Sequence, residues 1–296
     1  MDQAEPLRNI IKAGNVSVNK PQARVISVTS GKGGVGKSNT AINLAIQFRR
    51  QGLKVIILDA DFGLANIEIM FGAIPTYNLY DLIYQGKNIR EIITWGPMDV
   101  GFISGGSGIA GLSNLSRDYL LYIIKNLAEL DSIADIIIVD TGAGISDAVL
   151  EFLVASGEIL LVTTSEPTSI TDAYSLLKAL GRHPRFESES SEVKVIANRV
   201  AFLEDGETLY NKLNAVVSRY LKLPITYLGE IPEDHQLAKS VMQQTPVSLK
   251  APAARSAQAY EMIAAKLLDR EVGHRRLKRG MEAFFSHILT GKNLNY

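Results

Sequence analysis

The sequence predicts an α/β protein in which a doubly wound, mostly parallel sheet is flanked by helices. Short β-branched apolar runs alternate with longer segments of helical period, and the run Ile136–Val139 is apolar along its whole length. Strands that are buried on both faces and separated by helices of ten or more residues form βαβ units, which assemble into a parallel sheet. A glycine-rich phosphate-binding motif directly after the first apolar run supports the same fold class.

The elements follow one another through a single expected domain over roughly residues 22–270, with appendages at residues 1–21 and 271–296. The expected strands are the β-branched apolar runs Arg24–Thr29, Lys54–Leu58, Val100–Ser104, Asp135–Val139, Glu158–Val162, Val193–Ala197 and Ile225–Ile231. The expected helices include the segments of helical period Asn39–Gln51, Arg117–Leu130, Ile170–Leu180 and Leu209–Leu221.

Composition excludes several classes of protein. Among 296 residues, 31 lysines and arginines balance 31 aspartates and glutamates, so we expect no nucleic-acid partner. The absence of cysteine excludes disulfides and iron–sulfur clusters. The four histidines lie apart without carboxylates at ligand spacing, so we expect no metal site built on them. No apolar stretch reaches ~18 residues and residues 1–15 do not resemble a secretory signal, so we expect a cytoplasmic protein.

The run Gly31–Ser38 matches the phosphate-loop pattern G-x-x-x-x-G-K-[ST]. It follows an apolar run and precedes a helical segment, which is the context that the motif requires. Its glycines allow backbone N–H groups to turn towards phosphate oxygens, and the start of a helix adds positive potential. We expect Lys37 to reach the β- and γ-phosphates and the Ser38 hydroxyl to bind Mg²⁺. The expected nucleotide contacts in this loop are Gly33, Gly34, Val35, Gly36, Lys37, Ser38 and Asn39.

Lys32 adds a second lysine near the start of the loop, in the form K-G-G-x-G-K-[ST]. This form resembles the deviant Walker A motif of the MinD/ParA family of ATPases. The resemblance implies a MinD-like P-loop fold and an ATP-bound homodimer in which Lys32 crosses to the partner's phosphates. Such a lysine would offset the negative charge that develops on the transferred phosphoryl group, as an arginine finger does. Hydrolysis of ATP to ADP and phosphate would then be slow and would depend on the dimer.

Two acidic segments at strand ends are similar to the switch regions of the same family. The segment Asp59–Asn66 looks like its switch I, which implies that Asp61 orients or activates the attacking water near Mg²⁺ and that Asn66 contacts the partner's nucleotide. The segment Asp140–Gly144 looks like its switch II, which implies that Asp140 holds the metal through water. Lys32, Lys37 and Asp61 are therefore the expected catalytic residues, and Ser38, Asp61 and Asp140 the expected metal site.

The nucleotide base is expected between two loops that the family places after late strands. Asn198 follows one apolar run, and its amide offers both a donor and an acceptor to an adenine edge. The "IPxD" loop that contains Pro232 resembles the opposite wall. The chain lacks the N/T-K-x-D box of GTPases, which favours ATP. A second glycine pattern, G-x-G-x-x-G at residues 106–111, has no ribose-binding acid at the next strand, so we do not expect a dinucleotide site there.

The last segment of the chain has the pattern of an amphipathic helix that lies in an anionic membrane surface. Basic residues gather at its start, and its apolar residues share one helical face. The MinD branch of the family also ends in such a helix. The alternative is that this apolar face packs on the domain itself, and the two states could exchange. The expected membrane-binding residues are Arg275, Arg276, Leu277, Lys278, Arg279, Met281, Phe284, Phe285, Ile288 and Leu289.

The first residues distinguish the branches of the family. The opening segment resembles the "DQAxxLR" activation motif of the FlhG (YlxH/FleN) branch, which regulates flagellar number. The resemblance implies that this segment stimulates the GTPase FlhF, with Gln3 acting near the partner's nucleotide, and that flagellar C-ring components of the FliM/FliN/FliY type are partners. The residues that match the motif are Asp2, Gln3, Ala4, Leu7 and Arg8.

These features together predict an ATPase that controls the number and placement of bacterial flagella and binds the inner face of the cell membrane reversibly. Three alternatives stay open at this point. A MinD-type ATPase would position the division site, and a ParA-type ATPase would partition DNA and bind duplexes in a salt-sensitive manner. In the third alternative the protein is not an enzyme, and the nucleotide acts only as a structural switch.

Overall fold

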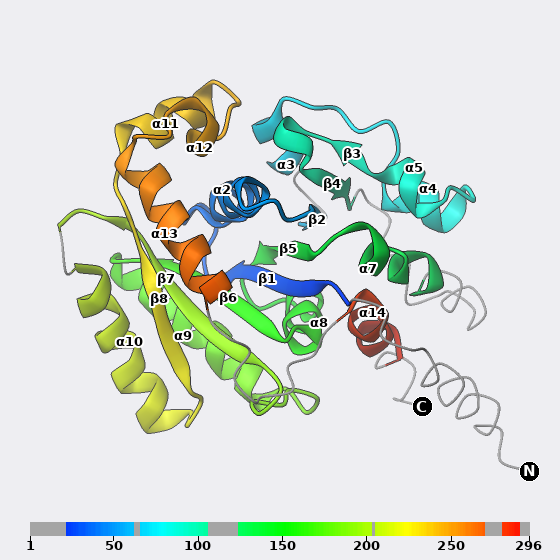
Figure 1. Cartoon of the computed structure of the whole chain (residues 1–296). Helices are drawn as coiled ribbons and strands as arrows, with labels where there is room; N and C mark the ends of the chain where they lie inside the picture. The colour runs from blue at the N-terminus through cyan, green and yellow to red at the C-terminus, as the bar shows by residue number, and fades with distance from the viewer. Residues whose placement is uncertain (1–21, 62–65, 106–123, 203–204, 270–279, 291–296) are drawn as a thin grey trace, which may run out of the picture.

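A computed structural model describes residues 22–61, 66–105, 124–202, 205–269 and 280–290 of the chain. Within them, one sheet of eight strands has the order β3-β4-β2-β5-β1-β6-β7-β8 (Figure 1). All neighbouring strands pair in parallel except β3 and β4, which pair antiparallel. The strands are β1 (Arg24–Ser30), β2 (Val55–Ala60), β3 (Thr94–Trp95), β4 (Gly101–Ser104), β5 (Ile136–Ala143), β6 (Glu158–Thr164), β7 (Glu192–Val200) and β8 (Ile225–Pro232).

Helices cover both faces of this sheet. In Figure 1, α2 and α13 lie over one face, while α8, α9 and α10 lie over the other, as expected of a doubly wound fold. The helices are α2 (Lys37–Arg50), α3 (Asn66–Phe71), α4 (Leu79–Tyr84), α5 (Ile89–Ile92), α7 (Leu130–Ile133), α8 (Asp147–Ala155), α9 (Pro167–Arg182), α10 (Asp205–Tyr220), α11 (His235–Met242), α12 (Val247–Lys250), α13 (Arg255–Asp269) and α14 (Met281–Thr290), with a 3₁₀ turn at Pro97–Asp99.

The fold class predicted from the sequence is confirmed. Each expected strand is present, and β5 is buried over its first six residues, as its unbroken apolar run predicts. The helix expected at Arg117–Leu130 lies partly outside the described residues. The two-residue strand β3 was not predicted, because so short a segment has no periodicity to read.

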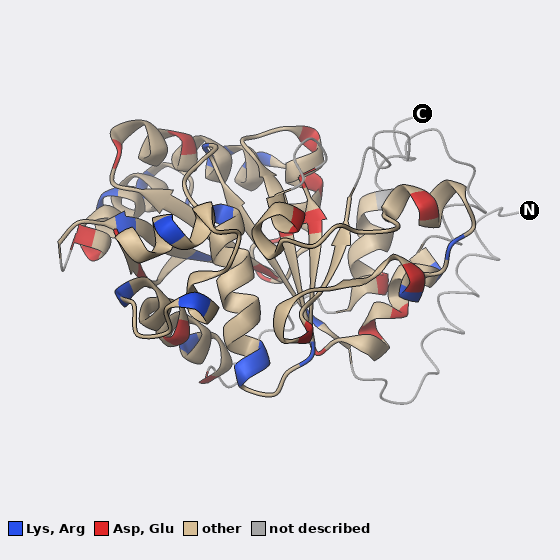
Figure 2. Ribbon diagram, turned by 90° about the horizontal axis from the view of Figure 1, so that it is seen from above, with Lys and Arg blue, Asp and Glu red and all other residues tan. Residues whose placement is uncertain are grey.

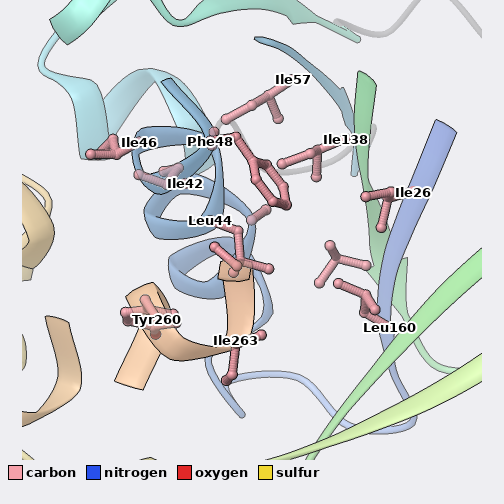
Figure 3. Packing of buried hydrophobic residues seen from close by; sticks show 14 of the residues in the cluster. Ile26, Ile42, Leu44, Ile46, Phe48, Ile57, Ile138, Leu160, Tyr260 and Ile263 are labelled. Carbon is pink, nitrogen blue, oxygen red and sulfur yellow. The ribbon is translucent and has the colours of Figure 1, made fainter. Parts of the chain in front are cut away.

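The central helix α2 forms the main core on its side of the sheet. Phe48 of this helix packs towards Ile57 and Ile138, which come from neighbouring strands (Figure 3). Tyr260 and Ile263 of α13 complete the cluster, and all five side chains are buried. This packing fixes the axis of α2, and therefore the loop that precedes it, relative to the ends of the strands.

Helix α14 is docked on the domain in this structure. Its apolar residues Met281, Phe284, Phe285 and Ile288 are buried in the same cluster as Phe152 of α8. The rings of Phe152 and Phe284 stack with centroids 5.9 Å apart. The alternative in which this face packs on the domain is therefore the state seen here. The expected basic cluster at residues 275–279 and the side chain of Leu289 lie outside the described part of the chain.

Asp131 clamps the start of α14. Its carboxylate accepts hydrogen bonds from the backbone N–H of Met281 at 2.9 and 3.0 Å and from that of Ala23 at 3.3 Å. Burial raises the pKa of Asp131, while these backbone donors act in the opposite direction.

Within the described residues, no helix is long and apolar enough to cross a bilayer.

Candidate functional site

The candidate nucleotide site lies where β1, β2 and β5 end. The phosphate loop leaves β1 and enters α2 at Lys37, so the loop sits at the carboxyl edge of the sheet. Register places Asp59 of β2 directly opposite Asp140 of β5. Ligands of open α/β sheets bind at this edge, because the loops and helix N-termini converge there.

The loop conformation depends on glycine at two positions. Gly34 has a φ of 76° and Gly36 a φ of 96°, both in the left-handed region. A Cβ atom on Gly36 would also collide with the side-chain amide of Asn198. Gly36 is the N-cap of α2 and offers no side-chain acceptor, so the first N–H groups of the helix are left for an anion.

Lys37 forms a buried ion pair with Asp140. The Nζ atom lies 2.9 Å from Oδ1 of Asp140, and both side chains are nearly inaccessible to solvent. Burial raises the pKa of Asp140, and the Lys37 ammonium acts against that shift. The lysine that the sequence assigns to the phosphates is thus already held at the site by the predicted switch II aspartate.

The donor set fits a magnesium ion. Oδ2 of Asp140 is buried and accepts no hydrogen bond from the described residues, so it is available to a water-bound cation. Ser38 directly follows Lys37 and would supply its hydroxyl. Among the described residues, no group of three or more histidine, aspartate and glutamate side chains is placed to hold a metal. A magnesium ion that enters with a nucleotide would be held by the Ser38 hydroxyl, with Asp140 acting through water.

Asp59 belongs to the site, although the sequence reasoning did not select it. Burial and the nearby charge of Asp140 raise its pKa to about 7. Its carboxylate accepts hydrogen bonds from the backbone N–H of Asp61 at 3.1 Å and of Ile67 at 3.5 Å. Asp59, the first residue of the predicted switch I, therefore binds the backbone inside this segment at Asp61 and directly after it at Ile67. The sequence contains a signal for this residue, because Asp59 directly follows the apolar run Val55–Leu58. A carboxylate at the end of a buried strand is itself buried unless the chain turns away.

The predicted switch residues Asp61 and Asn66 lie together. The amide of Asn66 lies 3.4 Å from Oδ2 of Asp61. A Cβ atom built on Gly142 would lie 3.7 Å from Oδ1 of Asp61, so the two predicted switches are neighbours. Residues 62–65 between them lie outside the described part of the chain.

Lys32 is bound within its own subunit. Its Nζ atom donates to Oε2 of Glu166 at 2.7 Å and to the Thr168 hydroxyl at 3.0 Å. Both charged side chains are exposed, and the hydrogen bond from Lys32, together with its charge, lowers the pKa of Glu166. The Lys32 ammonium thus lies at the surface of the site, where it can exchange one partner for another.

The expected base-binding residues are brought to one place. Asn198 is buried, and its amide donates to the carbonyl of Val35 in the phosphate loop at 2.6 Å. Register pairs Asn198 with Ile231 and Val200 with Pro232. Asn198 and Pro232 therefore lie near the ends of two neighbouring strands, β7 and β8. Arg199, with a φ of 55°, donates to the Gly34 carbonyl at 2.8 Å. Sequence reasoning had assigned no role to Arg199.

Several predicted features cannot be placed. The partner-activation residues Asp2, Gln3, Ala4, Leu7 and Arg8 lie outside the described residues, as does the second glycine pattern at residues 106–111.

The chain is similar to known nucleotide-binding proteins over most of its length. Residues 26–247 match the family model of the CobQ/CobB/MinD/ParA nucleotide binding domain. The antiactivator FleN of Pseudomonas aeruginosa is 37% identical over 82% of this chain and 86% of its own length. The flagellum site-determining protein YlxH of Helicobacter pylori is 34% identical over 97% and 98%.

Solved structures show the same fold. The cell division ATPase MinD of Pyrococcus furiosus aligns with a TM-score of 0.64 at 23% identity, covering 84% of this chain and all of its own. MinD of Pyrococcus horikoshii in complex with Mg-ADP aligns with a TM-score of 0.63 at 22% identity, covering 86% and 98%.

The fold and the phosphate loop define a P-loop nucleotide-binding protein of the deviant Walker A class. The chain belongs to the MinD/ParA family, on its FlhG (YlxH/FleN) branch.

Proposed function

We propose that this protein is an ATPase that regulates the number and placement of bacterial flagella through ATP-dependent homodimerisation and reversible membrane binding. The observation that supports the ATPase most directly is the buried pair of Lys37 and Asp140 beside the left-handed glycines of the phosphate loop. The flagellar role is supported by similarity to FleN and YlxH, which are 37% and 34% identical to the chain.

In the proposed reaction each side chain has one task. Bound Mg²⁺ would offset the charge of the β- and γ-phosphates. Lys37 would leave Asp140 for the phosphates, and Asp140 would then hold the metal through water. Asp61 would orient the attacking water, and Asn198 and Pro232 would enclose the base. Lys32 would exchange Glu166 for the partner's phosphates, which makes hydrolysis dependent on the dimer.

Membrane binding would require α14 to leave its docked position. Fully burying one large apolar side chain contributes about 1.5–3 kcal/mol, so release of four such residues is unfavourable in water. Insertion into a bilayer would restore a comparable apolar environment, and each basic residue near an anionic leaflet adds about 1 kcal/mol. Two helices on one dimer would bind together more tightly than either alone.

A liposome flotation assay tests this part of the proposal. A chain that ends at Arg270 is a poor probe, because its loss of α14 uncovers the core cluster around Phe152. Replacing Arg275, Arg276, Lys278 and Arg279 with glutamine leaves the apolar face unchanged. We expect flotation with anionic vesicles in ATP but not ADP, and its loss in this variant. Replacing the exposed Lys212 and Arg219 of α10 with glutamine is the matched control. Equal flotation of all three proteins would contradict membrane targeting by this helix.

The proposed partners are the GTPase FlhF and flagellar C-ring components of the FliM/FliN/FliY type. We expect the full chain to accelerate GTP hydrolysis by FlhF and Gln3→Ala to abolish this effect, whereas Asn9→Ala retains it. A Gln3→Ala protein that stimulates as well as the parent would remove the segment from this role. Figure 2 shows both signs of charge among the helices of the described residues, and the balanced charge of the sequence gives no reason to propose a nucleic-acid partner.

A further inference from the structure

Two large apolar side chains are exposed on the loops around the nucleotide site. Ile145, directly after the predicted switch II, has 55% of its surface accessible, and Phe202, in the loop after β7, has 75%. Exposed single apolar residues are common, but large ones next to a functional edge are typical of protein interfaces. Both positions follow strands whose carboxyl ends form the site, which places them at the same edge of the sheet.

The backbone holds both residues in place. The N–H of Gly144, the residue before Ile145, donates to the carbonyl of Ser30 at 2.9 Å, next to the phosphate loop. The N–H of Phe202 donates to the Asp205 carboxylate at 3.1 Å. Anchors on hydrogen-bonded loops lose less conformational entropy on association than anchors on free segments do.

The strand order arranges these residues in a row. Along the edge, β5, β1, β6 and β7 are consecutive neighbours. The loops after them carry Ile145, Lys32, Glu166 and Phe202, so two opposite charges lie between two apolar ends. Strands are about 4.8 Å apart, so the first and last strands of the row are separated by about 14 Å. Lys32 and Glu166 are near its middle.

A two-fold axis that crosses the middle of this row at a right angle reverses the order of the row. Rotation by 180° brings the Ile145 end of one copy onto the Phe202 end of the other, and the contact occurs twice. We propose that Ile145 of each subunit packs against Phe202 of its partner in the nucleotide-bound homodimer. These two apolar contacts flank the two nucleotides and exclude water from them. This inference rests on the proposed ATP-dependent dimer, and it assigns the residues that hold the two copies together.

The contact makes dimerisation sensitive to the state of the site. Ile145 directly follows the glycines of the predicted switch II, of which Gly144 has a φ of 92°. Phe202 follows Arg199, which is hydrogen-bonded to the phosphate loop. A nucleotide that shifts either loop therefore moves an apolar anchor with it. The second copy is the occupant that fits, because reversal brings the Lys32 side of each copy to the Glu166 side of the other, beside the phosphate loop that Lys32 reaches in the proposed dimer.

Cross-linking provides the most direct test, because the chain contains no cysteine. Ile145→Cys and Phe202→Cys chains are prepared separately and mixed with a non-hydrolysable ATP analogue and Mg²⁺ under mild oxidation. We expect a disulfide between one chain of each kind and little cross-linking in either chain alone. Cross-linking that is equally strong within each single variant would overturn the reversed arrangement.

Substitutions test the energetic role of the same residues. We expect Phe202→Glu and Ile145→Glu to weaken the analogue-bound dimer at least tenfold in light-scattering titrations, with nucleotide binding by the monomer unchanged. Phe202→Ala should act in the same direction with a smaller effect. Ile74→Glu is the matched control, because Ile74 is 92% exposed and its loop, after α3, is not one of the four loops of the row.

The two possible failures are distinguishable. If the unmodified chain dimerises with the analogue and both glutamate variants dimerise equally well, the inference is overturned while the proposed function stands. If the unmodified chain remains a monomer at concentrations where the analogue saturates it, the proposed dimer-dependent function is itself overturned.

Discussion

Nζ of Lys37 lies 2.9 Å from Oδ1 of Asp140, and this pair connects the phosphate loop to the predicted switch II in the interior of the protein. In the proposed function Lys37 binds phosphate and Asp140 holds the metal through water. Binding of a magnesium nucleotide would then give each of these two charges a new partner, so that neither is left unpaired. The pair would therefore couple occupancy of the site to the position of the predicted switch II.

Breaking this pair should destabilise the protein without nucleotide. Lys37→Ala leaves the Asp140 carboxylate buried and unpaired, and loss of one partner of a buried ion pair costs roughly 3–5 kcal/mol. Part of this loss is avoided when Asp140 takes up a proton. The double variant Lys37→Ala/Asp140→Asn should therefore lose less unfolding free energy than the two single variants lose in total. Denaturant unfolding measures all three losses. Additive losses would show that the pair contributes no coupling. Nucleotide binding should be lost in each Lys37 variant.

Asp59 should make the stability of the nucleotide-free protein depend on pH. Its pKa is about 7 in the folded protein and 3.8 in the reference state, so between these values the folded chain binds a proton that the unfolded chain does not. The free energy of unfolding therefore falls as pH rises from 4 to 7, by up to about 1.4 kcal/mol per unit. Asp59→Asn should flatten this slope in denaturant unfolding at several pH values. An unchanged slope would mean that another group titrates.

Gly36 should be intolerant of a side chain, and Gly33 should tolerate one. Alanine at position 36 is strained by the left-handed φ of 96° and would displace the Asn198 amide. A Cβ atom on Gly33 meets nothing within 4 Å. We expect Gly36→Ala to lower the free energy of unfolding by about 1–3 kcal/mol and Gly33→Ala to change it by less than ~0.5 kcal/mol. Similar losses for both variants would contradict the described loop conformation.

Asp131 should control the docking of α14. Because the chain has no cysteine, Phe285→Cys places a single thiol on the buried face of α14, and its labelling rate reports release of the helix. Asp131→Ala removes the acceptor of the Met281 N–H, so we expect labelling to accelerate at least tenfold. Ala283→Cys lies on the exposed face and should label quickly with or without Asp131. If both thiols keep their rates in the Asp131→Ala background, the clamp does not govern docking.

The sequence was informative where a motif occupies a strand end. Gly36, Lys37 and Asp140 could be predicted because the glycine and lysine spacing and the buried run Ile136–Val139 specify their positions along the chain. The sequence could not show that Lys37 and Asp140 bind each other, since β1 and β5 pair across more than one hundred residues. It also left two states open for the last helix. An apolar helical face has the same pattern whether it packs on α8 or on lipid, and tertiary contacts alone decide between them.

Asp59 shows a different limit of sequence reasoning. The pattern D-x-D drew attention to the second aspartate, which is only partly buried, whereas the first is enclosed beside Asp140. Residues two apart share one face of a strand, so whether the second carboxylate is enclosed like the first depends on where β2 ends. Strand ends are the least certain part of a sequence-based prediction.

In the proposed dimer, Lys32 leaves Glu166 and completes the site of a second copy. Light scattering in a non-hydrolysable ATP analogue, with the unmodified chain and Lys32→Ala, measures this step. We expect twice the 32.3 kDa mass for the unmodified chain and a nucleotide-bound monomer for the variant. A monomer in the first case, or an equally stable dimer in the second, would contradict this proposal.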